Sequence, residues 1–333
     1  MRGLYWRVQR RRGDSQWLRV AAEAVAAVGL LTVGLTISRA SGAPMPFAGS
    51  LPRLALGELG PAPTTQVRVD VLADSGRAVL VTSGDHAALV DGGSGPVGEA
   101  VVRRLDQLGI PRLDDVFLTR GNASSAVGLV AVMDALPVEH LWDLVPGNTC
   151  PAHKAVLADA HAHGVSVRPA EAGTSVTLGP AKLQVLWPLA ERDPQAETLA
   201  AEPGLVRLED GRLRMLLADG LTPGELGAVE RLGSALKAQV LEVPGGGRAG
   251  SVPTSLLQMV GPRVALMEPS AGGPDPATTA ELQLRHIVTV EVARTQDLRL
   301  ESDGRGLVLG FDAGEPGSPL AEVVPPQASG PCA

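Results

Sequence analysis

The chain has 333 residues and a formal net charge of −7, and 44% of its residues are hydrophobic. This apolar fraction is enough for a sizeable core, so it excludes a disordered chain. Two cysteines exclude a disulfide-stapled fold and a cysteine-rich zinc module. An aromatic content of 2% and an acidic body argue against nucleic acid as a partner.

An arginine-rich segment precedes a long apolar stretch. Residues 1–19 contain six arginines and one aspartate, and the 18 residues Val20–Ile37 are almost entirely apolar. As a helix this stretch would span roughly 27 Å, close to the thickness of a bilayer core. The positive-inside rule places residues 1–19 in the cytoplasm. We therefore predict a single-pass membrane helix or signal anchor over residues 20–38, with the rest of the chain extracytoplasmic.

Two alternatives to a retained anchor stay open. A cleaved signal peptide is the first, because Ser38-Arg39-Ala40 is a passable cleavage site. The apolar stretch is longer than a usual signal-peptide core, which favours the anchor. A buried core helix is the second, but it does not explain the arginine cluster or the flanking Trp6 and Trp17.

The remaining chain divides by composition. Residues 39–65 are rich in Gly, Pro and Ala and predict a linker, and residues 313–333 predict a similar tail. Between them, residues 66–312 predict one compact domain.

Strand and helix patterns alternate along this domain. Apolar runs bounded by turn residues predict strands over Gln66–Val71, Ala78–Thr82, Ala87–Asp91, Asp115–Thr119, Leu141–Leu144, Ser166–Arg168, Ser175–Leu178, Lys182–Trp187, Gly204–Leu208, Arg212–Leu217, Gln239–Val243, Val264–Met267, Ile287–Arg294, Leu298–Glu301 and Gly306–Phe311. Helical spacing predicts helices over Pro96–Leu108, Ser125–Leu136, Pro151–Gly164, Pro223–Leu236 and Val252–Val260, and Thr222 with Glu225 predicts a capping box. The pattern predicts an α/β fold in which helices cover sheets.

The order of several short motifs carries a family resemblance. These motifs are Val69-Asp70-Val71, Leu89-Val90-Asp91-Gly92-Gly93, Leu108-Gly109-Ile110, Leu118-Thr119, Leu183-Gln184-Val185-Leu186-Trp187-Pro188, Val240-Leu241-Glu242-Val243-Pro244, Pro262-Arg263-Val264-Ala265 and Ser302-Asp303-Gly304-Arg305-Gly306-Leu307. In this order the chain resembles the metallo-β-lactamase fold, and more narrowly the C-terminal domain of ComEC competence proteins. The resemblance implies a four-layer αββα sandwich.

The resemblance also implies a metal site, whose ligands are missing from this sequence. After Leu118-Thr119 the family motif is H-x-H-x-D-H, whereas this chain has Arg120-Gly121-Asn122-Ala123-Ser124-Ser125. The later family motif P-H-H-G-S corresponds to Pro244-Gly245-Gly246-Gly247-Arg248. The vestigial metal positions are therefore Arg120, Asn122, Ser124, Ser125, Asp219, Gly245 and Gly246. Catalytic sites of this kind need three or more protein ligands, so we expect no metal cofactor.

Arg120 and Arg248 would lie beside Asp219 at the rim of the former active site if the fold is correct. They could form an ion pair that plugs the site, or an anion pocket with the backbone amides of Gly245, Gly246 and Gly247. The carboxylate already at hand favours the plug.

These observations predict a pseudoenzyme that binds or scaffolds at the cell envelope, with the membrane and either an envelope protein or a small anion as partners. The first alternative is a metal-dependent phosphodiesterase that uses Asp219, Asp91 and a distant histidine. The second alternative is an anion sensor that uses Arg120 and Arg248.

Some further motifs have simpler interpretations. His161-Ala162-His163 lies at a helix end, where residues two apart cannot chelate together. The scattered His86, His140, His153 and His286 are expected to be surface or capping residues. The loop Asp91–Gly95 predicts a tight turn rather than a phosphate cradle. Asn122-Ala123-Ser124 matches a glycosylation sequon, and Cys150 and Cys332 could pair or stay free.

Overall fold

The computed structural model describes residues 67–73, 76–189, 203–268, 273–292 and 296–313. The chain divides into the units 1–50 and 51–333, and only the second contains described residues. The predicted basic segment, membrane helix and linker, and residues 314–333 of the tail, lie outside them. Within the described ranges, none of the helices has the length and apolar character needed to cross a membrane.

Two sheets form the centre of the described domain. An eight-stranded sheet has the order β15-β14-β1-β2-β3-β4-β5-β6, and a seven-stranded sheet has the order β13-β12-β11-β10-β9-β8-β7. The strands of the first sheet are β1 (Val67–Ala73), β2 (Arg77–Ser83), β3 (His86–Val90), β4 (Leu113–Leu118), β5 (Val138–Asp143), β6 (Ser166–Pro169), β14 (Gln296–Ser302) and β15 (Leu307–Ala313). Those of the second are β7 (Ser175–Leu178), β8 (Ala181–Trp187), β9 (Leu205–Asp210), β10 (Leu213–Leu217), β11 (Val240–Glu242), β12 (Val264–Met267) and β13 (Val288–Glu291).

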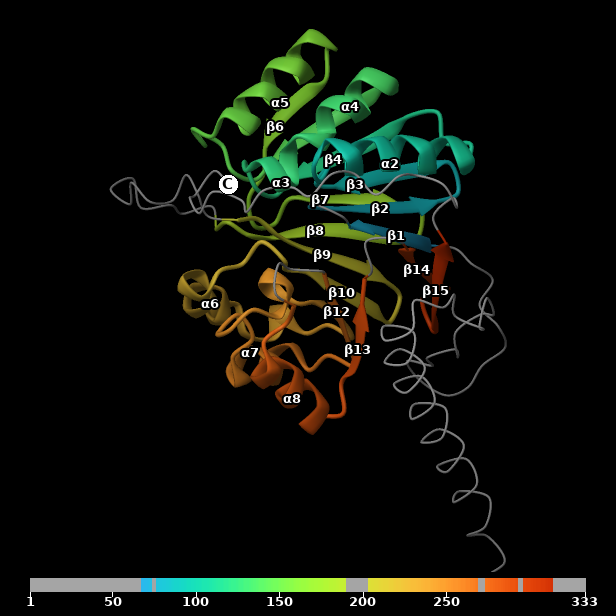
Figure 1. The fold of residues 1–333 in the computed structure, drawn as a ribbon. Helices are drawn as coiled ribbons and strands as arrows, with labels where there is room; N and C mark the ends of the chain where they lie inside the picture. The colour runs from blue at the N-terminus through green and yellow to red at the C-terminus, as the bar shows by residue number, and fades with distance from the viewer. Residues whose placement is uncertain (1–66, 74–75, 190–202, 269–272, 293–295, 314–333) are drawn as a thin grey trace, which may run out of the picture. The chain divides into compact units, whose positions relative to one another are not determined.

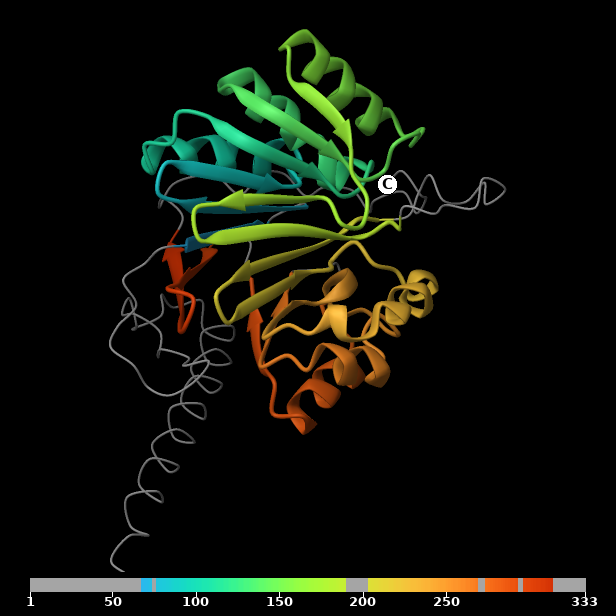
Figure 2. The same ribbon diagram turned by 180° about the vertical axis from the view of Figure 1, so that it is seen from behind.

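Helices cover the outer face of each sheet (Figures 1 and 2). The eight-stranded sheet is covered by α2 (Gly95–Gln107), α3 (Ala123–Ala126), α4 (Gly128–Ala135) and α5 (Pro151–Ala162). The seven-stranded sheet is covered by α6 (Pro223–Val229), α7 (Thr254–Val260) and α8 (Pro276–Leu284). The layers therefore follow the order helix, sheet, sheet, helix that the sequence resemblance implied.

Alternating side chains explain why the two sheets stack. Along β2, Val79 and Val81 belong to the apolar layer between the sheets, whereas Ala78 and Leu80 pack against the helices. In β12, Val264 and Leu266 face the inter-sheet layer and Ala265 faces the other helices. Successive residues of a strand point to opposite faces, so a strand that is apolar at every position is buried on both sides.

Parallel pairing brings the carboxyl ends of several strands to one edge. In the first sheet β3, β4, β5 and β6 run parallel, and in the second sheet β10, β11, β12 and β13 do. Each crossover passes through a helix or loop on the outer face, so the loops that follow these strands gather beyond the same ends. These edges carry the positions that the sequence assigned to the former metal site.

Two predicted helices are shorter in the structure because of their glycines. The predicted helix Ser125–Leu136 is divided into α3 and α4 just before Gly128. The predicted helix Pro223–Leu236 is α-helical only to Val229 and then continues as a 3₁₀ segment, in which Gly233 has non-helical backbone angles. The predicted capping box is confirmed, since the amide of Thr222 donates to Glu225 Oε2 at 2.7 Å.

Helices α2 and α4 approach closely where both lack side chains. A Cβ atom on Gly98 would lie 2.2 Å from the carbonyl oxygen of Gly128, and a Cβ on Gly128 would lie 1.9 Å from the carbonyl oxygen of Gly92. Backbone groups cannot move aside as a flexible side chain can. The contact therefore requires glycine.

We expect Gly98→Ala to destabilise the fold by roughly 1–3 kcal/mol, since the added methyl group overpacks a backbone contact. Gly227→Ala is the matched control, because Gly227 is also helical and nothing lies within 4 Å of its Cβ position. Alanine has the higher helix propensity, so this control should be neutral or stabilising by up to about 1 kcal/mol. Urea unfolding of both variants tests the contact, and equal stability of the two would refute it.

Candidate functional site

The vestigial metal positions lie in loops beyond the strand ends. Arg120 follows β4, and Asn122 is the N-cap residue of α3, which contains Ser124 and Ser125. Asp219 follows β10, while Gly245 and Gly246 lie in a 3₁₀ turn after β11. The structure brings these loops together, because the amide of Gly245 donates to the carbonyl of Asp219 at 2.9 Å.

These loops offer no set of ligands that fits a catalytic divalent ion. The side chain of Asn122 is buried, and the carbonyl of Ser125 accepts hydrogen bonds from the amides of Gly92 and Gly93 at 2.7 and 3.1 Å. From Arg120 to Ser125 there is no imidazole or carboxylate, and the later motif contributes only glycine. A catalytic zinc site needs three protein ligands, which these positions do not supply.

A buried arginine from another strand occupies this edge instead. The Nε of Arg77 lies 2.9 Å from Glu242 Oε1 and 3.2 Å from Glu268 Oε1, and its Nη2 lies 3.4 Å from Asp91 Oδ2. The side chain of Arg77 is 5% exposed, and those of Asp91 and Glu242 are 2% and 1% exposed. One guanidinium therefore faces three buried carboxyl groups.

Strand alternation explains how these charges meet. Each of these charged residues lies two positions from a residue of the inter-sheet layer. Arg77 precedes Val79 of β2 by two residues, Glu242 follows Val240 of β11 by two, and Glu268 follows Leu266 of β12 by two. All three positions therefore continue the face that lies between the sheets. We call Arg77, Asp91, Glu242 and Glu268 the edge cluster, because they end the inter-sheet apolar layer with charge.

The sequence analysis missed three of the four residues of the edge cluster. Arg77, Glu242 and Glu268 were not singled out, although each borders or interrupts an apolar strand. The available signal was the two-residue spacing that separates each of them from an inward-facing valine or leucine. Pairing across two sheets could not be read from that signal, because it depends on sheet stacking.

Asp91 joins the edge cluster to the first motif loop. Its Oδ1 accepts the amide of Thr119 at 2.8 Å and its Oδ2 accepts the hydroxyl of Thr119 at 2.6 Å. Asp91 has a left-handed φ of 59°, which turns the chain directly after β3. Its carboxylate is thus occupied by structural contacts and is not available as a metal ligand.

Burial sets the protonation of the acids in the edge cluster. It raises the pKa of Asp91 above the ordinary value, although Arg77 and the hydrogen bonds from Thr119 oppose the shift. Burial also raises the pKa of Glu242 and, with Asp219 and Glu242 nearby, raises that of Glu268 further. Glu242 and Glu268 hydrogen-bond each other, so the protonation of one depends on that of the other.

The charge of Arg77 responds in the opposite way. Its burial opposes the charged form, but the carboxylates of Glu242, Glu268 and Asp91 outweigh this and raise the pKa of the guanidinium above its ordinary value. Arg77 is therefore a permanent cation inside the protein.

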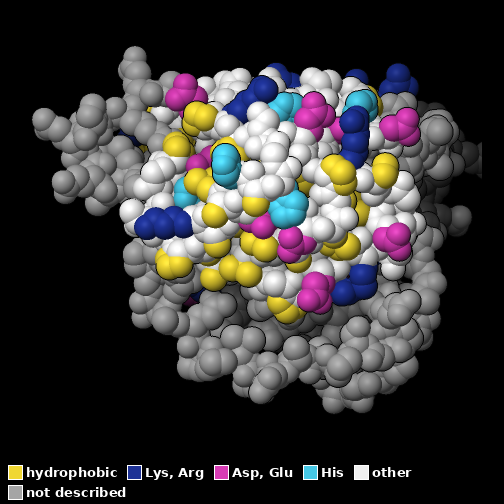
Figure 3. All heavy atoms as spheres, turned by 90° about the horizontal axis from the view of Figure 1, so that it is seen from above, with side chains coloured by type: hydrophobic (Ala, Val, Ile, Leu, Met, Phe, Trp, Pro, Cys, Tyr) yellow, Lys and Arg dark blue, Asp and Glu magenta, His cyan; other side chains and the backbone are white. Residues whose placement is uncertain are grey.

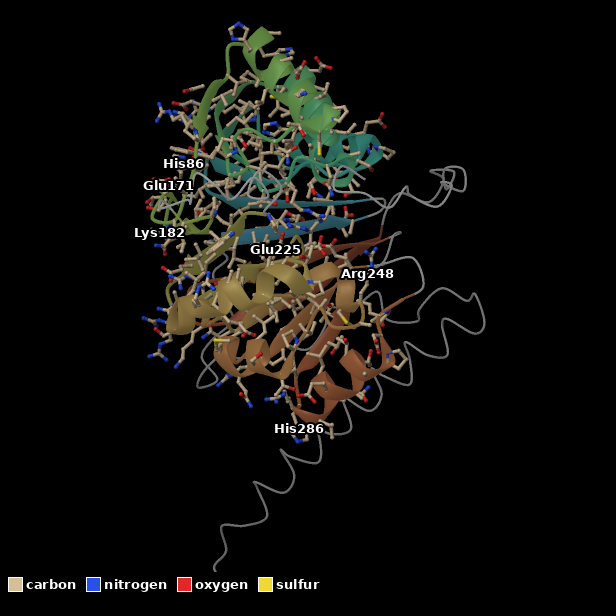
Figure 4. The ribbon with its side chains drawn as sticks, turned by 90° about the vertical axis from the view of Figure 1, so that its left-hand side faces the viewer. His86, Glu171, Lys182, Glu225, Arg248 and His286 are labelled. Atoms are coloured by element: carbon tan, nitrogen blue, oxygen red, sulfur yellow. The ribbon has the colours of Figure 1, made fainter. Side chains whose placement is uncertain are left out.

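The plug predicted from the sequence has a different cation in the structure. Within the part of the chain that the structure describes, neither Arg120 nor Arg248 forms an ion pair with Asp219. Arg120 lies against Gly220, whose Cβ position is 2.8 Å from Arg120 Cδ, and Arg248 is exposed (Figure 4). Arg77 supplies the buried positive charge because β2, unlike these loops, faces directly into the inter-sheet layer.

The histidines do not complete a metal site at this edge. His153 was expected to be a surface or capping residue, but it is buried, with Nε2 3.1 Å from Asp143 Oδ2. His86 and Arg248 lie on opposite sides of the domain in Figure 4, because His86 begins β3 at the other edge of the sheet. His140 pairs with Asp115 within β4 and β5.

Among the described residues, one group has three possible metal ligands close together: Asp134, Asp159 and His163. Its imidazole already bridges the two acids, with Nε2 3.5 Å from Asp134 and Nδ1 3.6 Å from Asp159. His161 does not join it, as helix geometry predicted. On the face over α2–α5, charged and histidine side chains are interspersed with hydrophobic ones (Figure 3). We interpret this group as a set of ion pairs that joins α4 to α5.

Three smaller expectations are decided by burial and bonding. The turn after Asp91 is structural, since the amides of Gly92 and Gly93 donate to Ser125 and are not free for phosphate. The sequon is unsuited to glycosylation because Asn122 is 4% exposed. Cys150 is not a free thiol but is disulfide-bonded.

Comparison with known proteins gives fold-level likenesses. No protein-family model and no curated protein matches the chain. The similar solved structures include the metallo-β-lactamase fold protein YhfI from Bacillus subtilis, at 14% identity over 71% of this chain and 99% of that one, with a TM-score of 0.44. They also include the subclass B3 metallo-β-lactamase MEM-A1 from a soil metagenome, at 12% identity over 67% and 93% of the two chains, with a TM-score of 0.40.

A third similar structure is a metallo-β-lactamase from Cronobacter sakazakii with a HARLDQ motif, at 15% identity over 52% of this chain and 73% of that one, with a TM-score of 0.38. These likenesses concern the fold alone. With TM-scores below 0.5, these structures carry no argument about function. The narrower resemblance to ComEC remains a prediction.

We expect Arg77→Met to destabilise the protein by about 3–5 kcal/mol, because it leaves buried carboxyl groups without their cation. Arg103→Met is the control, since Arg103 forms only an exposed pair with Glu99 and should change stability by less than about 0.5 kcal/mol. Adding Glu242→Gln and Glu268→Gln to Arg77→Met should restore part of the loss. Urea unfolding measures all three, and a mild effect of Arg77→Met alone would contradict the buried pairing.

We expect the edge cluster to lose stability as pH rises. The pKa of Glu268 is raised in the folded state, so its favourable contribution is complete below its ordinary value of 4.5 and is lost as pH rises through the raised value. Glu268→Gln should therefore raise the melting temperature relative to wild type at pH 8, and the difference should shrink toward pH 5. Glu99→Gln, an exposed change, should show no such trend. A Glu268→Gln variant that is less stable than wild type at pH 8 would contradict the raised pKa of Glu268.

Proposed function

We propose that the chain is a membrane-anchored, extracytoplasmic metallo-β-lactamase-like domain that performs no metal chemistry and binds or scaffolds a partner at the cell envelope. The observation that carries this proposal is the Arg77 guanidinium among Asp91, Glu242 and Glu268. The positive charge that balances the buried acids comes from the chain itself.

Electrostatics supports the loss of metal chemistry. A divalent ion at this edge would meet a fixed cation buried with it, and like charges repel strongly where water is excluded. The nearby Asp91 is occupied by Thr119 and Arg77, which leaves Asp219 as a lone acid of the vestigial set. The hydrolase alternative, which needs both acids and a histidine, therefore has little support.

The proposed location rests on two features. The arginine-rich segment 1–19 followed by Val20–Ile37 is typical of a cytoplasmic N-terminus and a single membrane span. The disulfide at Cys150 suits a compartment outside the cytoplasm, where disulfides persist. The ComEC-like resemblance supports the same side of the membrane.

The anion-sensor alternative retains one favourable feature. Arg248 is exposed and, within the described ranges, outside every ion pair, so its guanidinium is accessible to a small anion. Two of its three proposed amide partners are already used, because Gly245 donates to Asp219 and Gly246 donates to Val243 at 3.2 Å. A single exposed arginine without these amides makes a weak anion site.

We expect the full chain, purified from membranes in detergent, to contain far less than one equivalent of zinc, manganese or iron by elemental mass spectrometry. We also expect it not to hydrolyse bis(p-nitrophenyl) phosphate when these metals are added. An equimolar metal that is lost in Asp219→Ala but kept in the exposed-acid control Asp106→Ala would overturn the proposal. Stabilisation by inorganic phosphate that is abolished by Arg248→Ala would instead support the anion sensor.

A further inference from the structure

The loops that precede the parallel strands of the seven-stranded sheet carry exposed cations. Arg212 comes directly before β10, Lys237 lies three residues before β11, and Arg263 comes directly before β12. The amino ends of parallel strands meet at one edge of a sheet, so these residues lie opposite the edge that carries the edge cluster. The exposed Arg305 joins them, because the amide of Arg212 donates to the carbonyl of Gly304 at 2.7 Å. We call Arg212, Lys237, Arg263 and Arg305 the basic edge.

Backbone hydrogen bonds hold these loops side by side. The amide of Gln239 donates to the carbonyl of Arg214 at 2.9 Å, and the amide of Arg263 donates to the carbonyl of Gln239 at 2.9 Å. β10 and β12 are two steps apart in the strand order, which is about 10 Å at ~4.8 Å per step. This separation is close to the Debye length of about 8–10 Å near physiological ionic strength. The cations therefore act together on an approaching charge.

The charge of the basic edge is not neutralised within the described ranges, where none of its four side chains forms an ion pair. The neighbouring acids have other partners or are buried. Glu209 pairs with Arg207 and Arg214 at 2.9 and 3.2 Å, and Asp210 is buried. The Oδ1 of Asp303 accepts two backbone amides of its own turn, at 2.9 and 2.7 Å. Like charges gathered in this way repel each other, and an anionic partner would relieve the repulsion.

The chain enters the domain at the basic edge. Val67, the first residue of β1, pairs with Ser302, the last residue of β14. Gly304, whose carbonyl accepts the amide of Arg212, follows Ser302 by two residues. Whatever holds the chain upstream of Val67 is therefore joined to the domain beside these cations, and the edge cluster lies at the far ends of the strands.

We propose that the basic edge binds the headgroups of anionic phospholipids, so that the domain meets the bilayer with the amino ends of its parallel strands. This inference rests on the membrane anchor of the proposed function, because a chain anchored upstream of Val67 keeps the basic edge close to a bilayer. Anionic lipids attract clustered Lys and Arg side chains over about one Debye length. The carboxyl ends of the strands, with the vestigial metal positions, then face away from the membrane and toward a partner.

The test compares the full chain in nanodiscs of phosphatidylcholine with the full chain in nanodiscs of equal parts phosphatidylcholine and phosphatidylglycerol. Hydrogen–deuterium exchange is measured in residues 211–214, 236–239 and 261–263. We expect exchange there to be several-fold slower in the anionic discs, and the difference to shrink at high salt. The loops 120–125 and 244–247 should exchange equally in both discs. Equal exchange of the basic edge in both discs, or slowing at the two loops instead, would overturn the proposal.

A pair of matched double variants assigns the effect to the basic edge. Lys237→Gln with Arg263→Gln removes two of its exposed cations, and we expect the slowing in anionic discs to be largely lost. Lys154→Gln with Arg168→Gln removes one exposed lysine and one exposed arginine from α5 and β6, and should keep the slowing. An equal loss in both double variants would show attraction by net charge alone and would overturn the proposal.

Failure of the anchor is distinguishable from failure of the basic edge. A chain that inserts into neither kind of nanodisc contradicts the anchor of the proposed function. The basic edge is then tested by co-sedimentation of the same chain with vesicles of the two compositions. Binding to the anionic vesicles alone, lost in the Lys237 and Arg263 variant, supports the proposal, and no binding overturns it. Binding of a duplex oligonucleotide through these residues, without slowing in anionic discs, would assign nucleic acid as the partner and overturn it as well.

Discussion

The guanidinium of Arg77 within a group of buried carboxyl groups is the constraint on which this edge of the domain depends. The inter-sheet layer is apolar along most of its length, and at the carboxyl ends of its strands it must meet solvent and loops. There β2, β3, β11 and β12 each contribute one charged residue within or directly after the strand. Bringing these groups out of water is costly for each one alone and is tolerated because they compensate each other.

This arrangement connects the loops at this edge through groups of the chain itself. In a metal-dependent hydrolase, the cation at the strand ends holds several loops at once. Here the connections are made by Arg77 across the sheets, by Asp91 to Thr119, and by the amide of Gly245 to the carbonyl of Asp219. The loops converge through side-chain pairing and backbone hydrogen bonds.

The cluster also has consequences for what the site can do. Burial raises the pKa of Glu268, and the pairing of the buried acids with Arg77 leaves little free carboxylate to attract a second cation. The charged side chains that solvent and ligands can reach lie at the rim, where Arg248 is exposed and Asp219 is half-buried. Any ligand would therefore be recognised at the surface of this edge and not within it.

The amino-acid sequence by itself determined the elements and their alternation. Periodicity and turn residues located strands such as Ser175–Leu178 and Val264–Met267 at their observed bounds, because both signals are local. The absence of histidine and of acidic residues from positions 120–125 is likewise visible in the sequence alone.

Only the tertiary structure decided which cation balances the buried acids and which histidines are inside. Arg77 is 165 residues from Glu242 along the chain, and their contact at 2.9 Å exists because two sheets stack with matching faces. His153 is buried against Asp143 because α5 packs on the outer face of the first sheet. Both outcomes depend on how separate elements pack, and a pattern along one strand or helix carries no information about the element that will face it.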